Sequence, residues 1–425
     1  MTSDQYGRAG LRGLRRGTAD AVRARTSLHR NVVVLAGVHF VVDGYGNILT
    51  PLLPLLIPKL HLSLAAAGVL QMCFQLSNSV SQLAFGHLAD RWRPRVLLVG
   101  GPLVAVLTLP FVGLTGVAIA IAAVLIVGGL GGAAFHPPAA ALVHRYGGVR
   151  PGTAMSFHIT SGTLGQALAP LAFAPFAERF GLSMLPFLIL PALLVLVPLL
   201  PRIPPVERLH ERGTAAGFSA LRPYAKPLLL LYLIVVLRTL TAISFATFVP
   251  VMLTRRGWSV SEAGTAASIF LVAVGLGGFF GGPLADRFGP RRIIVLSLLA
   301  AVPLLAIAPL FAGWAFVAVL AVGGLLLQST LPVNVTFGQS IAPVSAATVS
   351  SLMMGFAWGM GGICVPFVGM AADRIGIEST LMFASALPLV AAALALPLPA
   401  GKQVHSVPRA SESSTTETTG TDVAP

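Results

Sequence analysis

Long apolar runs dominate the pattern of this chain. Between residues 31 and 398, runs of about 20 apolar residues follow one another and are separated by short stretches rich in Gly, Pro and Arg. A helix of about 20 residues crosses the roughly 30 Å hydrocarbon core of a bilayer, and it satisfies its own backbone hydrogen bonds there. The polar–apolar alternation of a membrane β-barrel is missing from the sequence. The pattern therefore predicts an all-α integral membrane protein with twelve transmembrane helices, near 31–58, 64–88, 95–115, 117–143, 150–177, 182–201, 227–253, 262–285, 291–311, 314–340, 346–371 and 379–398.

The ends of these predicted helices indicate two related halves. The second helix ends in GHLAD followed by Arg91, and the eighth ends in GPLAD followed by Arg287, 196 residues later. An acidic residue followed by arginine also ends the fifth and eleventh helices, at Glu178 and Asp373, which are 195 residues apart. Such symmetry predicts two pseudo-symmetric six-helix bundles. The predicted regions are a cytoplasmic N-terminal tail (1–30), an N-terminal bundle (31–201), a cytoplasmic linker (202–226), a C-terminal bundle (227–398) and a disordered cytoplasmic tail (399–425).

Composition and charge agree with a membrane protein. Only 10% of the residues are charged and 55% are hydrophobic, which leaves too few charges to cover a soluble domain. If the N-terminus is cytoplasmic, 22 of the 28 Lys and Arg residues fall on the cytoplasmic side. We therefore expect a multi-pass protein of a bacterial inner membrane with both termini in the cytoplasm. The net charge of +14 then marks topology, and we expect no nucleic-acid partner.

Several kinds of chemistry have no signature in the sequence. Cys73 and Cys364 stand alone inside predicted helices, so local spacing suggests neither a disulfide framework nor a metal cluster. The sequence has no phosphate-binding loop with a Lys-Ser or Lys-Thr pair, and no nucleophile elbow. We therefore expect no cofactor, no metal, no ATP as the energy source and no enzymatic activity.

Two lone charges lie inside the predicted helices. Asp43 is the only acidic residue in the middle of a helix, and Arg238 is the only Lys or Arg there. They are 195 residues apart, so the repeat puts them at equivalent positions, facing each other across a central cavity at mid-membrane. Burying an unpaired charge is costly, so we interpret them as coupling residues or, alternatively, as a static ion pair. His39, four residues before Asp43, shares its helix face and is a candidate proton relay.

Other polar residues inside the helices are candidates for the substrate pathway. Gln71, Gln75, Asn78 and Gln82 recur at helical spacing, so they share one face that must point away from lipid. They are predicted to line a wet cavity or, alternatively, to bond neighbouring helices. His136 precedes Pro137 and Pro138, so it either lines the cavity or bonds the carbonyls that the prolines free; His158 is a similar candidate.

The repeated loops suggest a cytoplasmic gate. An Asp at the C-terminus of its own helix faces the unfavourable end of the helix dipole, so it needs an Arg or the N-terminus of another helix. We predict that Asp90 packs near residues 345–350 and Asp286 near residues 150–153 when the cytoplasmic side is closed; the alternative is that the arginines only mark topology. The predicted gate residues are Gly86, Asp90, Arg91, Arg95, Gly282, Asp286, Arg287, Arg291 and Arg292.

These loops resemble the loop signature of the major facilitator superfamily. Within it, the sequence is similar to the fosmidomycin-resistance family of drug exporters, through His39-x3-Asp43, Phe135-His136-Pro137, Gly162-x2-Gly165-x4-Pro170 and the glycines from Gly355 to Gly362. The resemblance implies the major facilitator fold and a bacterial, proton-driven exporter of small molecules.

Residues and resemblance together lead to one functional expectation. We expect a secondary transporter that works by alternating access, with a small-molecule substrate, protons and membrane lipid as its partners, and a monomeric state. Proton-coupled efflux is the first interpretation. An uptake symporter is the second, and a membrane receptor that transports nothing is the third.

Overall fold

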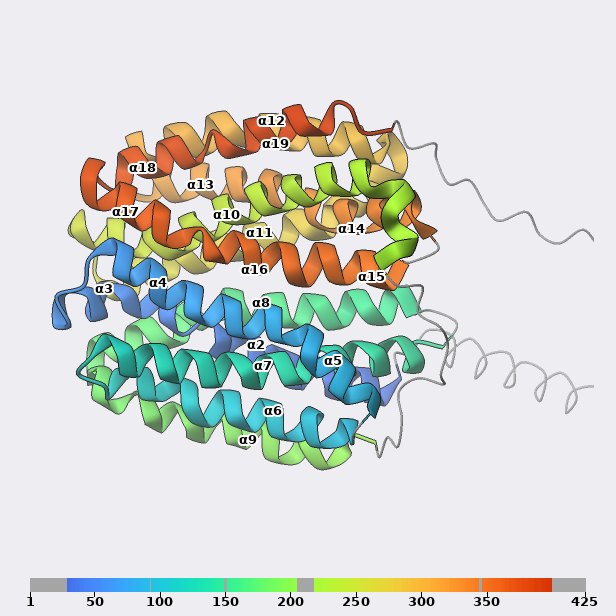
Figure 1. Ribbon diagram of the computed structural model, residues 1–425. Helices are drawn as coiled ribbons and strands as arrows, with labels where there is room; N and C mark the ends of the chain where they lie inside the picture. The colour runs from blue at the N-terminus through green and yellow to red at the C-terminus, as the bar shows by residue number, and fades with distance from the viewer. Residues whose placement is uncertain (1–28, 92, 149–150, 205–217, 344–345, 400–425) are drawn as a thin grey trace, which may run out of the picture.

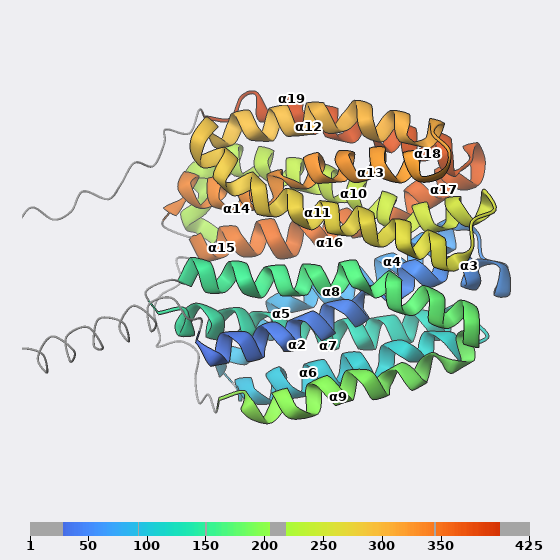
Figure 2. The same ribbon diagram turned by 180° about the vertical axis from the view of Figure 1, so that it is seen from behind.

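Two helical bundles lie side by side in the computed structural model, which describes residues 29–91, 93–148, 151–204, 218–343 and 346–399. The N-terminal bundle occupies the lower part of Figure 1 and the C-terminal bundle the upper part. The described chain begins and finishes at the same end of the molecule, here named the terminal end; the opposite end is the far end (Figures 1 and 2).

The N-terminal bundle follows the six predicted helices closely. Prolines and short π-helical or 3-10 turns divide several of them into pieces. The pieces are α2 (Arg30–Gly46) and α3 (Leu49–Lys59); α4 (Leu64–Gln75), a π-helical turn (Leu76–Val80) and α5 (Ser81–Arg91); α6 (Pro94–Thr108) and a 3-10 turn (Leu109–Gly113); α7 (Ala118–Tyr146); α8 (Pro151–Phe180); and a 3-10 turn (Leu182–Leu188), α9 (Ile189–Leu199) and a 3-10 turn (Leu200–Arg202).

The C-terminal bundle repeats this order. It also contains one π-helical turn, in the eleventh predicted helix. Its pieces are a 3-10 turn (Phe218–Tyr224) and α10 (Ala225–Arg255); α11 (Val260–Phe288); α12 (Pro290–Ile307) and a 3-10 turn (Ala308–Leu310); α13 (Gly313–Gln328) and α14 (Thr330–Ile341); α15 (Ala346–Ser350), the π-helical turn (Ser351–Phe356), α16 (Ala357–Ile363) and α17 (Val365–Ile375); and α18 (Ile377–Ala384) and α19 (Leu387–Ala395).

The helices have the length and surface that a bilayer requires. Within the described ranges, ten helical segments are long and apolar enough to cross a membrane. The two remaining predicted spans, near 64–88 and 150–177, also coincide with helical stretches of the described chain, at 64–91 and 151–180. Large apolar side chains face outward, and Leu194 and Ile119 are each 79% exposed. Such a surface is stable against lipid tails, so the all-α membrane fold predicted from the sequence is confirmed.

The sequence repeat is visible in the backbone. Gly181 ends α8 with φ = 83°, and Gly376, 195 residues later, ends α17 with φ = 86°. These φ values favour glycine because a Cβ would clash with the backbone there. The same turn therefore follows the fifth and eleventh predicted helices, as two-fold repetition of the chain requires.

Near the far end the two bundles touch through closely packed helices. α8 of the N-terminal bundle lies along α11 of the C-terminal bundle, and α4 lies along α17 (Figures 1 and 2). A Cβ at Gly264 would come within 2.5 Å of the Ala174 side chain, and a Cβ at Gly68 within 2.8 Å of the Pro366 backbone. Glycine at both positions lets helices of different bundles approach more closely than larger residues would allow.

Candidate functional site

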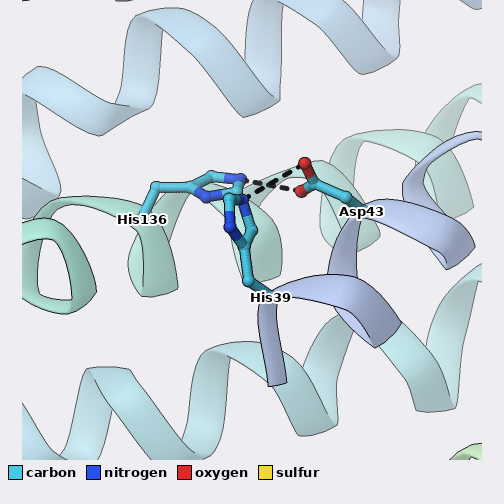
Figure 3. A group of neighbouring side chains, drawn as sticks. All are labelled: His39, Asp43 and His136. Carbon is cyan, nitrogen blue, oxygen red and sulfur yellow. Dashed lines mark ion pairs between the residues drawn. The ribbon is translucent and has the colours of Figure 1, made fainter. Parts of the chain in front are cut away.

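Asp43 is the centre of a buried polar cluster in the N-terminal bundle. Its carboxylate lies 3.2 Å from His39 Nε2 on the same helix, α2, and 3.4 Å from His136 Nε2 on α7. The three side chains point toward one another (Figure 3), and each keeps only 10–17% of its surface exposed. Gln166 on α8 donates a longer hydrogen bond, of 3.5 Å, to Asp43 Oδ2. Three helices thus supply one carboxylate with several polar partners inside the bundle.

One hydrogen bond of His39 fixes the role of its Nδ1. Nδ1 lies 2.8 Å from the carbonyl oxygen of His158, and a carbonyl can only accept, so Nδ1 carries a hydrogen. The other ring nitrogen, Nε2, faces the Asp43 carboxylate at 3.2 Å. With a hydrogen on Nε2 the two groups form an ion pair, and without it the Nε2 lone pair is free to bind a cation.

Glycines on α8 allow this close approach. A Cβ at Gly165 would lie 2.1 Å from the Phe40 carbonyl oxygen, and one at Gly162 would lie 2.5 Å from His39 Nε2. The His158 ring stacks on the His39 ring, with centroids 4.2 Å apart, and its Nδ1 has no hydrogen-bond partner. The Gly162-x2-Gly165 spacing therefore brings α8 against α2 at the depth of Asp43, and the structure brings His136 and His158 to the same cluster.

Arg238 is not the partner of Asp43. Its side chain is fully buried in the C-terminal bundle, where Nη1 donates to Gln328 Oε1 and Nη2 donates to Thr239 Oγ1 at 3.1 Å. Its guanidinium carbon lies 5.9 Å from the centroid of the Trp358 ring. In the described chain, no ion pair joins Arg238 to Asp43. The repeat gives the two residues equivalent positions in their bundles, but each finds polar partners within its own bundle.

Two polar residues of the second predicted helix contact different neighbours. Gln75 is 9% exposed, and a Cβ at Gly362 on α16 would lie 2.5 Å from its Cβ. Asn78 instead faces α7, where a Cβ at Gly132 would lie 2.6 Å from its Oδ1. The two side chains contact different helices because the π-helical turn Leu76–Val80 changes the 3.6-residue period. That these residues line the substrate pathway stays a prediction.

Thiol labelling can test this division. In a variant without Cys73 and Cys364, we expect Gln71→Cys to react with a small polar thiol reagent at least about tenfold faster than Gln75→Cys, because local closure excludes the reagent from buried positions. Gln71 is half-buried, whereas Gln75 packs between the bundles. Equal rates at the two positions would contradict the packing described above.

The gate residues at the terminal end make few contacts. The side chains of Asp90 and Arg91 lie outside the described set, as do residues 345 and 150, so the predicted contact of Asp90 remains a prediction. Asp286, Arg95 and Arg292 are exposed, and Arg287 lies 5.2 Å from the Phe288 ring. Arg291 donates to the Leu398 carbonyl at 3.1 Å. Gly86 lies near Pro137, and no atom lies within 4 Å of a Cβ built at Gly282.

The clearest contacts between the bundles involve two acidic residues at the far end that were not predicted as site residues. Glu178, at the end of α8, accepts backbone hydrogen bonds from Val260 at 3.0 Å and Ser261 at 2.9 Å, and a third from the Ser261 hydroxyl. These groups form the N-terminus of α11, so a carboxylate of one bundle caps a helix of the other.

Asp373 makes the equivalent contact in the other direction, from the C-terminal bundle to a helix of the N-terminal bundle. At the end of α17, it accepts hydrogen bonds from the backbone N–H groups of Leu64 at 2.8 Å and Ala65 at 2.9 Å, at the N-terminus of α4. We call these two contacts the far-end caps. The acidic–Arg repeat at 178 and 373 was their sequence signal. The argument from helix dipoles, applied above only to Asp90 and Asp286, holds equally for these residues.

One group in the described chain has the donors and spacing for a metal ion. His39, Asp43 and His136 each offer one donor atom, and these atoms lie within 4.8 Å of one another. No residue of the C-terminal bundle belongs to this trio.

Comparisons with known proteins agree with the fold and the repeat. The family model described as Major Facilitator Superfamily matches residues 35–244 and again residues 231–420. The chain is 28% identical to the fosmidomycin resistance protein of Escherichia coli over 389 residues, which covers 88% of this chain and 93% of that protein. It is also 28% identical to YfnC of Bacillus subtilis, named as a transporter of the same type, over 89% of this chain and 95% of that protein.

Two solved structures share the architecture. A bacterial homologue of the lysosomal transporter Spinster, in an inward-facing and occupied conformation, has a TM-score of 0.72 at 19% identity, covering 86% of this chain and 95% of that one. The nucleoside transporter NupG has a TM-score of 0.72 at 13% identity, covering 87% of this chain and 99% of that one. At such identities the likeness supports the fold alone.

Proposed function

The chain belongs to the major facilitator superfamily, and from that membership we propose that it exports a small molecule across a bacterial inner membrane in exchange for protons. Members of this superfamily are transporters and not enzymes, so the chain is a multi-pass membrane transporter. Efflux is proposed because a relative covering nearly the whole chain is named for resistance to fosmidomycin. The excess of Lys and Arg on one side supports cytoplasmic termini. A monomer remains the expected state.

The observation that carries proton coupling is the pair of His39 and Asp43. The carboxylate lies inside the bundle, and in the described chain its charged partners are histidines and not a permanent cation. Such a partner can lose its proton near neutral pH, whereas an arginine cannot. A carboxylate that is balanced by histidines can therefore change its charge state during a transport cycle.

Alternating access requires that the two ends of the carrier open in turn. The far-end caps support an arrangement that is closed at the far end, because two carboxylates hold helix N-termini of the opposite bundle. The exposed Asp286 at the terminal end is then free to form its predicted contact when that end closes. We propose that the substrate binds between the bundles, at the depth of Asp43 and Arg238.

A flux experiment tests the function and separates its alternatives. We expect proteoliposomes with an acidic lumen to accumulate fosmidomycin, or another compound of a drug and metabolite panel, because protons leaving the lumen drive the substrate inward. Protein-free liposomes are the control. Accumulation only with an alkaline lumen would support an uptake symporter. The third interpretation, a receptor that transports nothing, is not supported by the family membership. If no compound shows gradient-dependent accumulation, the proposal is wrong.

A further inference from the structure

The trio of His39, Asp43 and His136 has the spacing of a metal centre. In tetrahedral coordination with metal–ligand distances of about 2.0–2.2 Å, neighbouring donor atoms lie about 3.3–3.6 Å apart. His39 Nε2 lies 3.2 Å from Asp43 Oδ2, and His136 Nε2 lies 3.4 Å from Asp43 Oδ1. The donors of all three side chains fall within 4.8 Å of one another. Binding one ion to all three would require the side chains to rotate until the donors are about 3.3–3.6 Å apart.

The surroundings hold the donors in place. The Nδ1 of His39 is fixed by the His158 carbonyl at 2.8 Å, which directs the other ring nitrogen, Nε2, toward the trio. A backbone carbonyl or carboxylate on the second ring nitrogen is the usual support of a metal-binding histidine. Gln166 contacts Asp43 Oδ2 from α8 in the same supporting role.

Space beside the donors is kept free by a glycine. A Cβ at Gly162 would lie 2.5 Å from His39 Nε2 and 2.7 Å from Asp43 Oδ2. These distances are too short for a carbon atom, so a side chain at position 162 would displace His39 or Asp43. Beside the trio, His158 is 3% exposed and its Nδ1 is unpartnered, although buried polar atoms normally have partners. The cluster is thus polar, and one of its buried nitrogens has no partner.

We propose that His39, Asp43 and His136 bind one late first-row divalent metal ion, with Zn²⁺ as the best match, and leave a fourth position for water or a ligand. Two imidazoles and one carboxylate suit Zn²⁺, Co²⁺ or Ni²⁺ better than Mg²⁺ or Ca²⁺, which prefer all-oxygen sites. The inference goes beyond the proposed function because it rests on the geometry of the trio and on no assumption about flux or direction.

Metal binding to the purified full-length protein tests the inference. The protein is prepared in detergent micelles without a histidine tag, Zn²⁺ binding is followed by calorimetry, and Co²⁺ is used as a visible-absorption probe. We expect one ion per chain and Co²⁺ absorption bands typical of tetrahedral coordination. Asp43→Asn and His136→Gln should each weaken binding more than about 100-fold, since loss of a supporting residue alone weakens it about 10–100-fold. The matched control His87→Gln, exposed on α5, should leave binding unchanged.

Gly162→Ala provides a second variant that removes no donor. Its methyl group should fill the space beside His39 and Asp43 and weaken Zn²⁺ binding, whereas Gly152→Ala on the same helix has no neighbour within 4 Å and should not. Size-exclusion profiles show which variants are folded. Absence of saturable binding by the wild-type protein, or wild-type affinity in both Asp43→Asn and His136→Gln, overturns the proposal. Because no gradient is used, this result is separate from the flux result: proton-driven transport without metal binding rejects only the metal site.

Discussion

Replacing Asp43 by asparagine is expected to lower gradient-driven substrate transport at least about 100-fold, equivalent to roughly 2.7 kcal/mol. An amide fits the same space between His39 and His136, but it cannot take up and release a proton. The measurement is accumulation in proteoliposomes with an acidic lumen. Counterflow, in which labelled and unlabelled substrate exchange without a proton gradient, should persist, because the route through the protein is intact.

A carboxylate outside the cluster provides the matched control. Glu378 pairs with Arg256 at 3.3 Å, and the two side chains are 46% and 26% exposed. Exposed pairs contribute about 0–1 kcal/mol, so Glu378→Gln should transport within a few-fold of the wild-type rate. If Asp43→Asn drives accumulation at the normal rate, Asp43 does not carry the coupling proton. If it also loses counterflow and is poorly folded, the cluster is structural.

Removing both far-end caps is expected to shift the conformational equilibrium toward opening at the far end by about 30-fold. Each carboxylate at a helix N-terminus contributes about 1 kcal/mol. The double variant Glu178→Gln/Asp373→Asn should therefore lower the free energy that favours the closed far end by about 2 kcal/mol. The readout is the labelling rate of Ala174→Cys by a membrane-impermeant maleimide, in a chain without Cys73 and Cys364. Ala174 is fully buried against Gly264, so it should react only when the bundles separate.

Glu262 offers a control on the same helix as one of the caps. It closes a capping box with Ser259 at the N-terminus of α11, within one bundle. Glu262→Gln should weaken that helix end but should not raise the labelling of position 174. Unchanged labelling in the double variant would mean that packing alone, through contacts such as Gly264 against Ala174, keeps the far end closed.

Acid should weaken one of the two caps. The hydrogen bond from the Ser261 hydroxyl, with those from the Ser261 and Val260 N–H groups, lowers the pKa of Glu178 from its ordinary 4.5. A carboxylate whose pKa is lower in the closed state stabilises that state above its ordinary pKa, and the contribution is lost as the pH falls through the lowered value. Acid also slows the reaction of every thiol, because the thiolate is the reactive form. The labelling rate of Ala174→Cys divided by that of an exposed reference cysteine at the same pH should therefore rise below the ordinary pKa of Glu178. Glu178→Gln should show a smaller rise.

The membrane fold and its repeat follow from sequence alone. A backbone in lipid must satisfy its own hydrogen bonds, so apolar runs near 20 residues form helices, and each predicted span is largely helical where the structure describes it. The internal symmetry could be predicted from the Asp-Arg and Glu-Arg helix endings, because equivalent helix ends need equivalent residues. The glycines at 181 and 376, which share a positive φ, are one example. Asp43 and His39 could be paired from their spacing of four, since that spacing sets both on one face of a regular helix.

Tertiary structure decided which partners each charge finds. Repeat arithmetic relates Asp43 to Arg238, but it cannot say whether a side chain reaches across the molecule or bonds within its own bundle; here His136 is nearer to Asp43, and Gln328 is nearer to Arg238. The regular period that aligned Gln75 with Asn78 fails at a π-helical turn, which depends on packing against neighbouring helices. Glu178 and Asp373 cap helices of the opposite bundle, contacts between residues at least 82 positions apart that no local pattern specifies. Local spacing determines which residues share a helix face, whereas the packing of helices within and between the bundles determines which residues that face contacts.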